Sequence, residues 1–196
     1  MSRISDVFGA SFREAQNLLS TYIDDQEIQG AHVALAGRLA ATFQAGGKVL
    51  IAGNGGSMTD AMHFAEEWTG RFRSDRRPYP AMALADAAHL SCVANDYGFE
   101  FVFSRMVEAF AGPKDLLILL STSGNSLNLL RAADSAREAG CFVFGFLGRG
   151  GGPLLAKCDQ AIIAPGTTAD RIQELHLMSL HMLIEATERL LEQSGS

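Results

Sequence analysis

Five short segments of this chain are apolar at successive positions, and they constrain the fold more than any other feature of the sequence. They are Val49 to Ala52, Ala81 to Ala85, Leu116 to Leu120, Phe142 to Leu147 and Ala161 to Ala164. A strand that is apolar on both sides must be covered on both sides, which is typical of parallel sheets. The segments between the runs are long enough for crossover helices. The pattern therefore predicts an α/β fold with a five-stranded parallel sheet and helices on both faces.

Helical periodicity accounts for most of the remaining chain. Crossover helices are expected at residues 60–69, at 87–94 followed by 99–110, and at 127–139, with a shorter turn near Leu154. Two amphipathic helices, at 4–23 and 28–43, precede the first strand, and they either cap a face of the sheet or pack against another subunit. A final helix at 170–193 is apolar nearly all the way round. It is expected to be buried on more than one side, within the monomer or at an oligomer contact.

The length and charge of the chain limit its organisation and its partners. No linker or internal repeat divides the 196 residues, so we expect one domain over 1–196, with the two leading helices in 1–45 and an α/β core in 48–196. The chain carries 22 acidic and 16 basic residues, for a net charge of -6. Neither nucleic acid nor a membrane is expected as a partner, because both usually need a basic surface, and no apolar run approaches the roughly 20 residues that span a bilayer.

The cysteines indicate a compartment. There are three, Cys92, Cys141 and Cys158, and they are widely spaced without any C-x-x-C pattern. An odd number at such spacings is a poor disulfide framework. We therefore expect buried thiols in a protein of the reducing cytoplasm.

Two polar loops follow strand candidates and are the first candidates for a binding site. Gly53-Asn54-Gly55-Gly56-Ser57 follows the first apolar run, with Ser57 as the expected N-cap of the next helix, and Ser121-Thr122-Ser123-Gly124-Asn125-Ser126 follows the third. Glycines let backbone amides approach an anion, and a helix N-terminus adds N–H groups and partial positive charge. Either loop alone is explained as a capped turn. Two of them, each between a strand and a helix of one sheet, favour a phosphate site.

Two other clusters have simpler interpretations. The segment Gly148-Arg149-Gly150-Gly151-Gly152-Pro153 follows the fourth apolar run without a hydroxyl or an acid, and it is interpreted as a flexible connection. The basic run Arg71, Arg73, Arg76 and Arg77 either adds positive potential near an anionic substrate or is a set of solvated loop charges.

Acidic and histidine side chains supply candidates for catalysis or metal binding. His63 and Glu67 are four residues apart on a predicted helix, so they share a face that suits a two-point metal site, a histidine oriented by a carboxylate, or a simple surface contact. On the last helix Gln173 and His176 are neighbours, whereas His176 and His181 differ by about 140° and cannot easily face one site. One of these two histidines is therefore expected to be a hydrogen-bonded core residue.

At these positions the chain strongly resembles the phosphoheptose isomerases, members of the sugar isomerase (SIS) domain family. The matching stretches run in the family's order over nearly the whole chain: Gly53 to Ser57, Asp60 to Glu67, Asn95 to Phe99, Ser121 to Ser126 and Asp170 to Glu174. The resemblance implies a single SIS domain with a sheet of flavodoxin-like type, a homotetramer, and one Zn²⁺ per subunit. It also implies conversion of sedoheptulose 7-phosphate to D-glycero-D-manno-heptose 7-phosphate, for heptose biosynthesis in lipopolysaccharide or other bacterial surface polysaccharides.

The resemblance also implies roles for single residues. The zinc ligands fall on His63, Glu67, Gln173 and His181, and the catalytic pair on Glu67 and His181. This favours Glu67 over Glu66 and His181 over His176. Because Gln173 and His181 are roughly 12 Å apart along an ideal helix, both reach one metal only if their side chains lean together, the helix start is irregular, or different subunits contribute. The implied substrate contacts are Asn54, Gly55, Gly56, Ser57, Asn95, Asp96, Ser121, Thr122, Ser123, Ser126, Asp170 and Gln173.

Aldose–ketose isomerisation through an enediolate needs a base that reaches two adjacent carbons, an acid/base partner for the oxygens, and stabilisation of the oxyanion. We expect Glu67 to move the carbon-bound proton, His181 to handle the hydroxyl protons, and zinc to act as a Lewis acid. The alternative is a non-catalytic SIS-family protein that binds a phosphosugar or the bacterial replication initiator. Such a protein resembles this chain in the loops but need not keep the acid/base set, and here His63, Glu67, Gln173 and His181 are all present.

Overall fold

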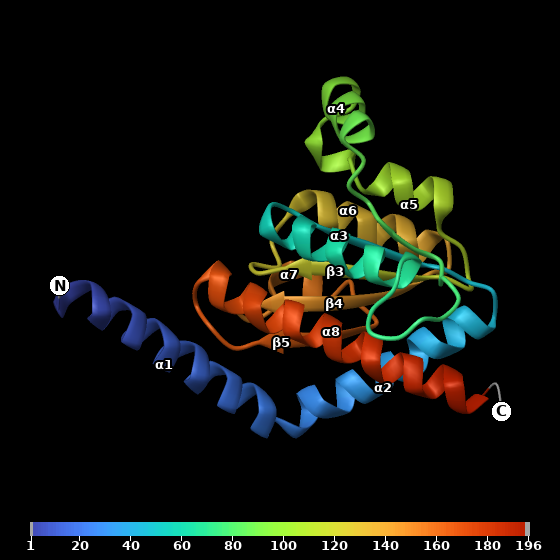
Figure 1. Ribbon diagram of the computed structural model, residues 1–196. Helices are drawn as coiled ribbons and strands as arrows, with labels where there is room; N and C mark the ends of the chain where they lie inside the picture. Colours follow the sequence, from blue (N-terminus) through green and yellow to red (C-terminus); the bar gives the residue numbers. More distant parts are fainter. Residues whose placement is uncertain (1, 195–196) are drawn as a thin grey trace.

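The computed structural model describes residues 2–194, whose five strands form one parallel sheet (Figure 1). The strand order is β2-β1-β3-β4-β5, and every neighbouring pair is parallel, as the sequence predicts. The strands are β1 Val49–Gly53, β2 Ala81–Ala83, β3 Leu116–Ser121, β4 Phe142–Gly148 and β5 Gln160–Ala164. Strand β2 is shorter than the apolar run 81–85 predicts. The chain then turns into the next helix, where Asp86 is the N-cap and accepts a hydrogen bond from the His89 amide.

Helices connect the strands and lie close to the predicted positions. The helix at 87–94 runs to Asp96, and the predicted 99–110 helix is divided into a 3-10 turn, Phe99–Phe101, and a separate helix. A break at Asp25 separates the two leading helices, because this side chain caps the second helix by accepting from the Glu27 and Ile28 amides. The helices are α1 Ser2–Asp24, α2 Gln26–Gln44, α3 Gly56–Thr69, α4 Ala87–Asp96, α5 Ser104–Phe110, α6 Leu127–Glu138, α7 Gly152–Leu155 and α8 Ala169–Ser194.

The sheet is the middle of three layers, and alternate strand residues enter the two cores. Ile51 and Ile118 face a core built with α2, α3 and α8, whereas Leu50 and Leu117 face a core built with α5, α6 and α7. Residues of β1 and β3 are almost fully buried on both faces. This burial explains why the central strands are apolar at every position.

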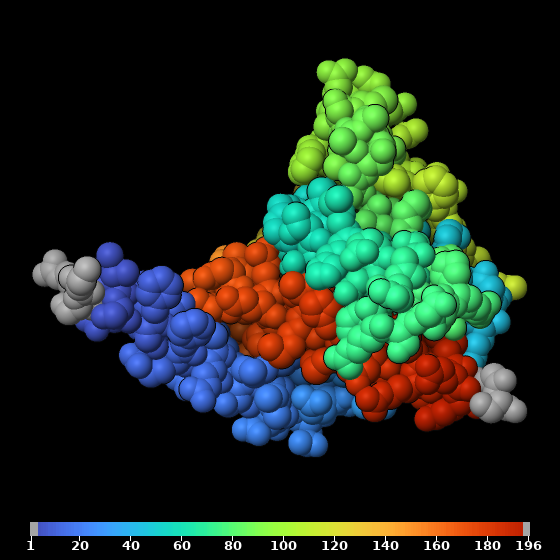
Figure 2. All heavy atoms as spheres, viewed as in Figure 1, coloured from blue at the N-terminus to red at the C-terminus, as the bar shows by residue number. Residues whose placement is uncertain are grey.

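Two helices, α1 and α4, project from this body (Figures 1 and 2). Helix α1 carries exposed apolar side chains at Ile4, Val7, Phe8 and Phe12, each more than 60% exposed. Its C-terminal end is anchored, because Tyr22 is buried and its hydroxyl hydrogen-bonds Ser179 of α8 at 2.8 Å. Helix α2 therefore has the first role expected for the leading helices, because it covers a face of the sheet. Most of α1 does not cover the sheet, and its apolar stripe is exposed.

The expectation of three buried cysteines is wrong for Cys92, which is exposed on the projecting α4. Cys141 is buried and Cys158 half-buried, and burial raises the pKa of both thiols to about 12. All three cysteines are free thiols. Between residues 2 and 194, no helix combines the length and apolar character that crossing a bilayer requires.

Candidate functional site

The two polar loops meet at the point where the strand order reverses. Strand β1 continues through the loop at residues 53–57 into α3, and neighbouring β3 continues through residues 121–126 into α6. In open parallel sheets this crevice, beyond the carboxyl ends of the strands, is where ligands bind. Asn54 and Asn128 join the two sides by a reciprocal pair of amide hydrogen bonds of 2.9 and 2.8 Å. Asn128, which the sequence did not single out, therefore fixes the separation of the loops.

A small pocket lies between these loops and the start of α8. Gln173 of α8 closes it, and its amide Nε2 donates to Ser57 Oγ at 3.3 Å. The Ser121 and Ser123 hydroxyls accept from backbone amides inside their own loop. The lining side chains are polar and uncharged except for Leu120, which is apolar: Asn54, Ser57, Leu120, Ser121, Thr122, Ser123, Ser126 and Gln173. The pocket thus offers hydroxyls, amides and the N-termini of two helices to an anion, which is the chemistry the sequence predicts.

Ser57 does not have the predicted N-cap role. Helix α3 begins at Gly56, its N-cap is Gly55 with φ 56°, and no side chain caps it. Because Ser57 already lies in the first turn, its hydroxyl is buried beside Gln173 instead of folding back onto the helix. Gly56 also allows Gln173 to approach closely, since a Cβ on Gly56 would lie 2.7 Å from the Gln173 Oε1 atom.

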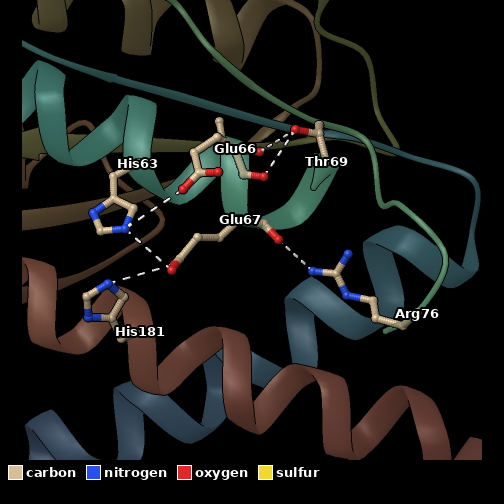
Figure 3. A network of polar contacts seen from close by, with 7 residues as sticks. His63, Glu66, Glu67, Thr69, Arg76 and His181 are labelled. Atoms are coloured by element: carbon tan, nitrogen blue, oxygen red, sulfur yellow. Dashed lines mark hydrogen bonds and ion pairs between the residues drawn. The ribbon is translucent and has the colours of Figure 1, made fainter. Parts of the chain in front are cut away.

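A second cluster joins α3 to α8 (Figure 3). Glu67 lies between two histidines, with Oε1 3.4 Å from His63 Nε2 and Oε2 3.8 Å from His181 Nε2. The two imidazole rings have centroids 5.1 Å apart, and Phe72 stacks against the His181 ring. The His63 and Glu67 pair predicted from helical spacing is therefore confirmed as a contact, and α8 adds His181.

The donor set of this cluster fits a zinc ion. One ligand atom from each of His63, Glu67 and His181 lies within 4.8 Å of the others. Glu67 Oε2 is buried and has no hydrogen-bond partner, which is costly unless a cation or substrate group satisfies it. Two imidazoles and one carboxylate are a ligand set of catalytic zinc sites, which keep a further position open. Gln173 hydrogen-bonds Ser57 in this structure, and its role as a metal ligand stays a prediction.

Asp60 belongs to the same face of α3 and had no assigned role. It precedes His63 by three residues, a spacing that could have revealed it in the sequence. Its Oδ2 atom is buried without a hydrogen-bond partner. Burial raises the pKa of Asp60 above its ordinary value, and the nearby His63 and His181 oppose this rise. The cluster therefore has a second carboxylate close to the two histidines.

Two members of the basic run pair with carboxylates of α8, and one of them also contacts α3. Arg76 donates to the Glu67 and Trp68 carbonyls at 2.7 and 2.9 Å, which satisfies the C-terminal end of α3. Its Nε atom also pairs with Glu188 of α8 at 2.7 Å. Arg73 pairs with Glu185 of α8 in a more exposed contact. Both arginines therefore have partners within the fold, and Arg76 joins α3 to α8.

Comparison with known proteins decides the family. Residues 12–148 match the SIS domain family. The chain belongs to the SIS domain family. Within it, phosphoheptose isomerases from Fusobacterium nucleatum and Proteus mirabilis are each 48% identical to this chain, over 93% and 95% of its length and 94% and 98% of theirs.

Solved structures agree with this assignment. A phosphoheptose isomerase from Francisella tularensis superposes with a TM-score of 0.90 at 30% identity, covering 94% of this chain and 97% of its own. The protein from Neisseria gonorrhoeae gives 0.87 at 33% identity, covering 94% and 99%. This SIS-domain protein is therefore an enzyme, a phosphosugar isomerase of the phosphoheptose isomerase group, and the alternative of a non-catalytic relative is set aside.

Three predicted contacts of this SIS isomerase lie outside both clusters. Asn95 and Asp96 are exposed on the projecting α4, where the Asn95 amide donates to the Asp96 carboxylate. Asp170 is exposed at the start of α8, and hydrogen bonds from Thr168 and the Arg171 amide lower its pKa. The chain by itself does not bring these three side chains to Glu67, so their substrate contacts stay predictions.

His176 is the core histidine of α8. It is fully buried, and its Nε2 must carry the proton because it donates to the Leu147 carbonyl at 3.1 Å. Burial lowers the pKa of His176 to about 4, against a smaller opposite effect of the Leu147 carbonyl. The structure therefore separates the two histidines that helical spacing left open, with His181 at the cluster and His176 in the core.

Proposed function

We propose that this SIS isomerase interconverts sedoheptulose 7-phosphate and D-glycero-D-manno-heptose 7-phosphate through an enediolate. The observation that carries the proposal is the position of Glu67 between His63 and His181, on the helix whose first turn lines the hydroxyl pocket. The names of the relatives, which are 48% identical over nearly the whole chain, support the heptose substrate.

The spacing of the two clusters suits a seven-carbon sugar phosphate. Ser57 in the pocket and His63 in the cluster are six residues apart on α3, about 9 Å along the helix axis. An open-chain heptose 7-phosphate carries its phosphate at one end and the reacting C1 and C2 at the other. The phosphate would accept hydrogen bonds from Ser57, Ser121 and Ser123, and from the helix N-termini, while C1 and C2 reach Glu67.

Proton transfer is assigned to Glu67 and His181. The Glu67 carboxylate is largely buried and its Oε2 has no hydrogen-bond partner, so this oxygen is available to take a proton from one carbon and return it to the adjacent one. His181 lies on the same side, and its half-exposed ring can exchange protons with the two substrate oxygens. Phe72 stacks on the imidazole of His181 and restrains the orientation of that ring.

One zinc ion per subunit would be held by His63, Glu67 and His181, with Gln173 as the proposed fourth ligand. When bound, such an ion supplies Lewis-acid stabilisation of negative charge on a substrate oxygen. Glu67 can have both roles because its carboxylate has two oxygens, so that one could bind the ion while the other transfers the proton.

We further propose a cytoplasmic homotetramer that supplies heptose for bacterial surface polysaccharides. The apolar stripe of α1, formed by Ile4, Val7, Phe8 and Phe12, needs covering in water and suits packing between copies. The projecting α4 would carry Asn95 and Asp96 to the site of a neighbouring subunit, which gives these exposed residues a role in substrate binding. The exposed free thiol of Cys92 suits a reducing compartment.

The proposal is tested by incubating the purified full-length protein with sedoheptulose 7-phosphate and separating the heptose phosphates by chromatography. We expect conversion to the aldose phosphate, loss of conversion after treatment with a chelator, and its return on addition of Zn²⁺. A matched incubation with fructose 6-phosphate tests the length of the substrate. No conversion of the heptose phosphate in any metal state would contradict the proposal.

A further inference from the structure

The glycine-rich segment at residues 148–152, expected to be a flexible connection, is instead folded against one of the two polar loops. We call residues 121–126 the hydroxyl loop. A turn closes the segment, with the Gly151 amide donating to the Gly148 carbonyl at 2.9 Å. The Leu154 amide, just after the segment, donates to the Gly124 carbonyl of the hydroxyl loop at 3.1 Å. The two loops are therefore joined through their backbones.

The contact is too close for any side chain to lie between the loops. A Cβ on Gly152 would lie 2.8 Å from the Gly124 carbonyl oxygen and 2.9 Å from that of Ser123. A Cβ on Gly124 would lie 1.8 Å from the Gly151 oxygen. Both glycines also have positive φ, 54° at Gly152 and 65° at Gly124, where residues with a Cβ are strained. Glycine is thus required on both sides of this contact.

The same segment reaches the start of α8. A Cβ on Gly148 would lie 2.9 Å from the Thr122 carbonyl oxygen and 2.6 Å from the Ile172 side chain. Ile172 immediately precedes Gln173, which closes the pocket. The end of β4 therefore lies against both the hydroxyl loop and the start of α8.

We propose that Gly148, Gly151 and Gly152 act as positioning residues that hold the hydroxyl loop in its phosphate-binding shape, an inference that rests on the proposed function of the pocket. Inside the loop, the Ser121 and Ser123 hydroxyls accept from the Gly124 and Asn125 amides. On the outside, Gly148 and Gly152 pack against the carbonyls of residues 122–124, and the Leu154 amide donates to the Gly124 carbonyl. A loop ordered before the ligand arrives binds more tightly, because no ordering entropy is lost on binding.

Two alanine variants of the same segment separate packing from backbone strain. Gly152→Ala and Gly150→Ala both place a Cβ at positive φ, 54° and 78°, but a Cβ at Gly150 meets no atom within 4 Å. We expect Gly152→Ala to raise KM for the sugar phosphate, and the inhibition constant of inorganic phosphate, by about tenfold or more, the size expected when hydrogen bonds to a charged ligand are lost. Its kcat should change much less, and Gly150→Ala should resemble the wild type in all three constants.

Equal effects of Gly152→Ala and Gly150→Ala on KM would overturn the inference. Where circular dichroism shows that Gly152→Ala does not fold, Gly148→Ala decides in its place, because it meets the Thr122 carbonyl without positive φ. Normal phosphate inhibition in Gly148→Ala would then overturn the inference. Ser123→Ala separates the two proposals. If Ser123→Ala raises KM and Gly152→Ala does not, only the positioning role fails. If Ser123→Ala has normal KM and normal phosphate inhibition, the proposed function of the pocket is contradicted.

Discussion

His181 Nε2 lies 3.8 Å from Glu67 Oε2, and the two side chains come from α8 and α3, which are far apart in the sequence. The packing of these two helices therefore decides whether the acid/base pair exists. Helix α3 is placed by the loop after β1 at its start and by Arg76 at its end. The distance between Glu67 and His181 thus depends on contacts made outside the site.

Replacing Glu67 by Gln should abolish most turnover and preserve substrate binding. The amide keeps the size of the side chain but cannot take a proton, so we expect kcat to fall by about 10² to 10⁴. Timed assays of heptose phosphate conversion measure kcat, and calorimetric titration with the substrate measures binding. Glu66→Gln is the matched control, because Glu66 is exposed and lies 3.9 Å from His63. Similar kcat values for the two variants would contradict the role of Glu67.

Metal content should depend on both helices of the cluster. We expect about one zinc per subunit by elemental analysis of the wild-type protein, and much less in His63→Ala or His181→Ala, because each removes an imidazole ligand. His89→Ala is the control, since His89 contacts the Val102 carbonyl away from the cluster. Full zinc content in both cluster variants would show that the ion binds elsewhere.

Arg76→Met should lower the stability of the fold. Its guanidinium pairs with Glu188, and both side chains are about 15% exposed, so truncation leaves a largely buried carboxylate unpaired. We expect a loss of about 3 kcal/mol in the free energy of unfolding, measured with urea. The control is Arg73→Met, which breaks the exposed pair with Glu185 and should cost less than about 1 kcal/mol. Equal losses would show that burial of the Arg76 pair does not matter.

His176 should make folding sensitive to acid. Its pKa is about 4 in the folded chain and near 6.5 when unfolded, so the unfolded chain binds the proton first as pH falls. The stabilisation is complete above pH 6.5 and is lost as the pH falls towards 4, by about 3 kcal/mol. His176→Gln keeps a donor for the Leu147 carbonyl without titrating. Urea unfolding at pH 8, 6 and 4.5 should show a smaller acid loss in the variant, and parallel curves would contradict this assignment.

The parts of this protein that the sequence determined are those set by neighbouring residues. Apolar runs predicted all five strands, because a strand that is buried on both faces is apolar at successive positions of its own sequence. Helical spacing predicted that His63 and Glu67 share a face of one helix, which is a local property. The two polar loops were found in the same way, since each follows a strand directly. Each of these features involves residues within one turn, one strand or one loop.

The physical contacts between distant residues came from the tertiary structure, although the family resemblance had already favoured His181 over His176. The tertiary structure placed His181 at the cluster and His176 in the core, paired Asn54 with Asn128, and used Arg76 to join α3 to α8. It also turned Ser57 into the pocket, exposed Cys92, and packed the glycine segment at 148–152 against the hydroxyl loop. These outcomes follow from how helices and loops pack across the sheet, and no periodicity within a segment records which distant backbone it will touch.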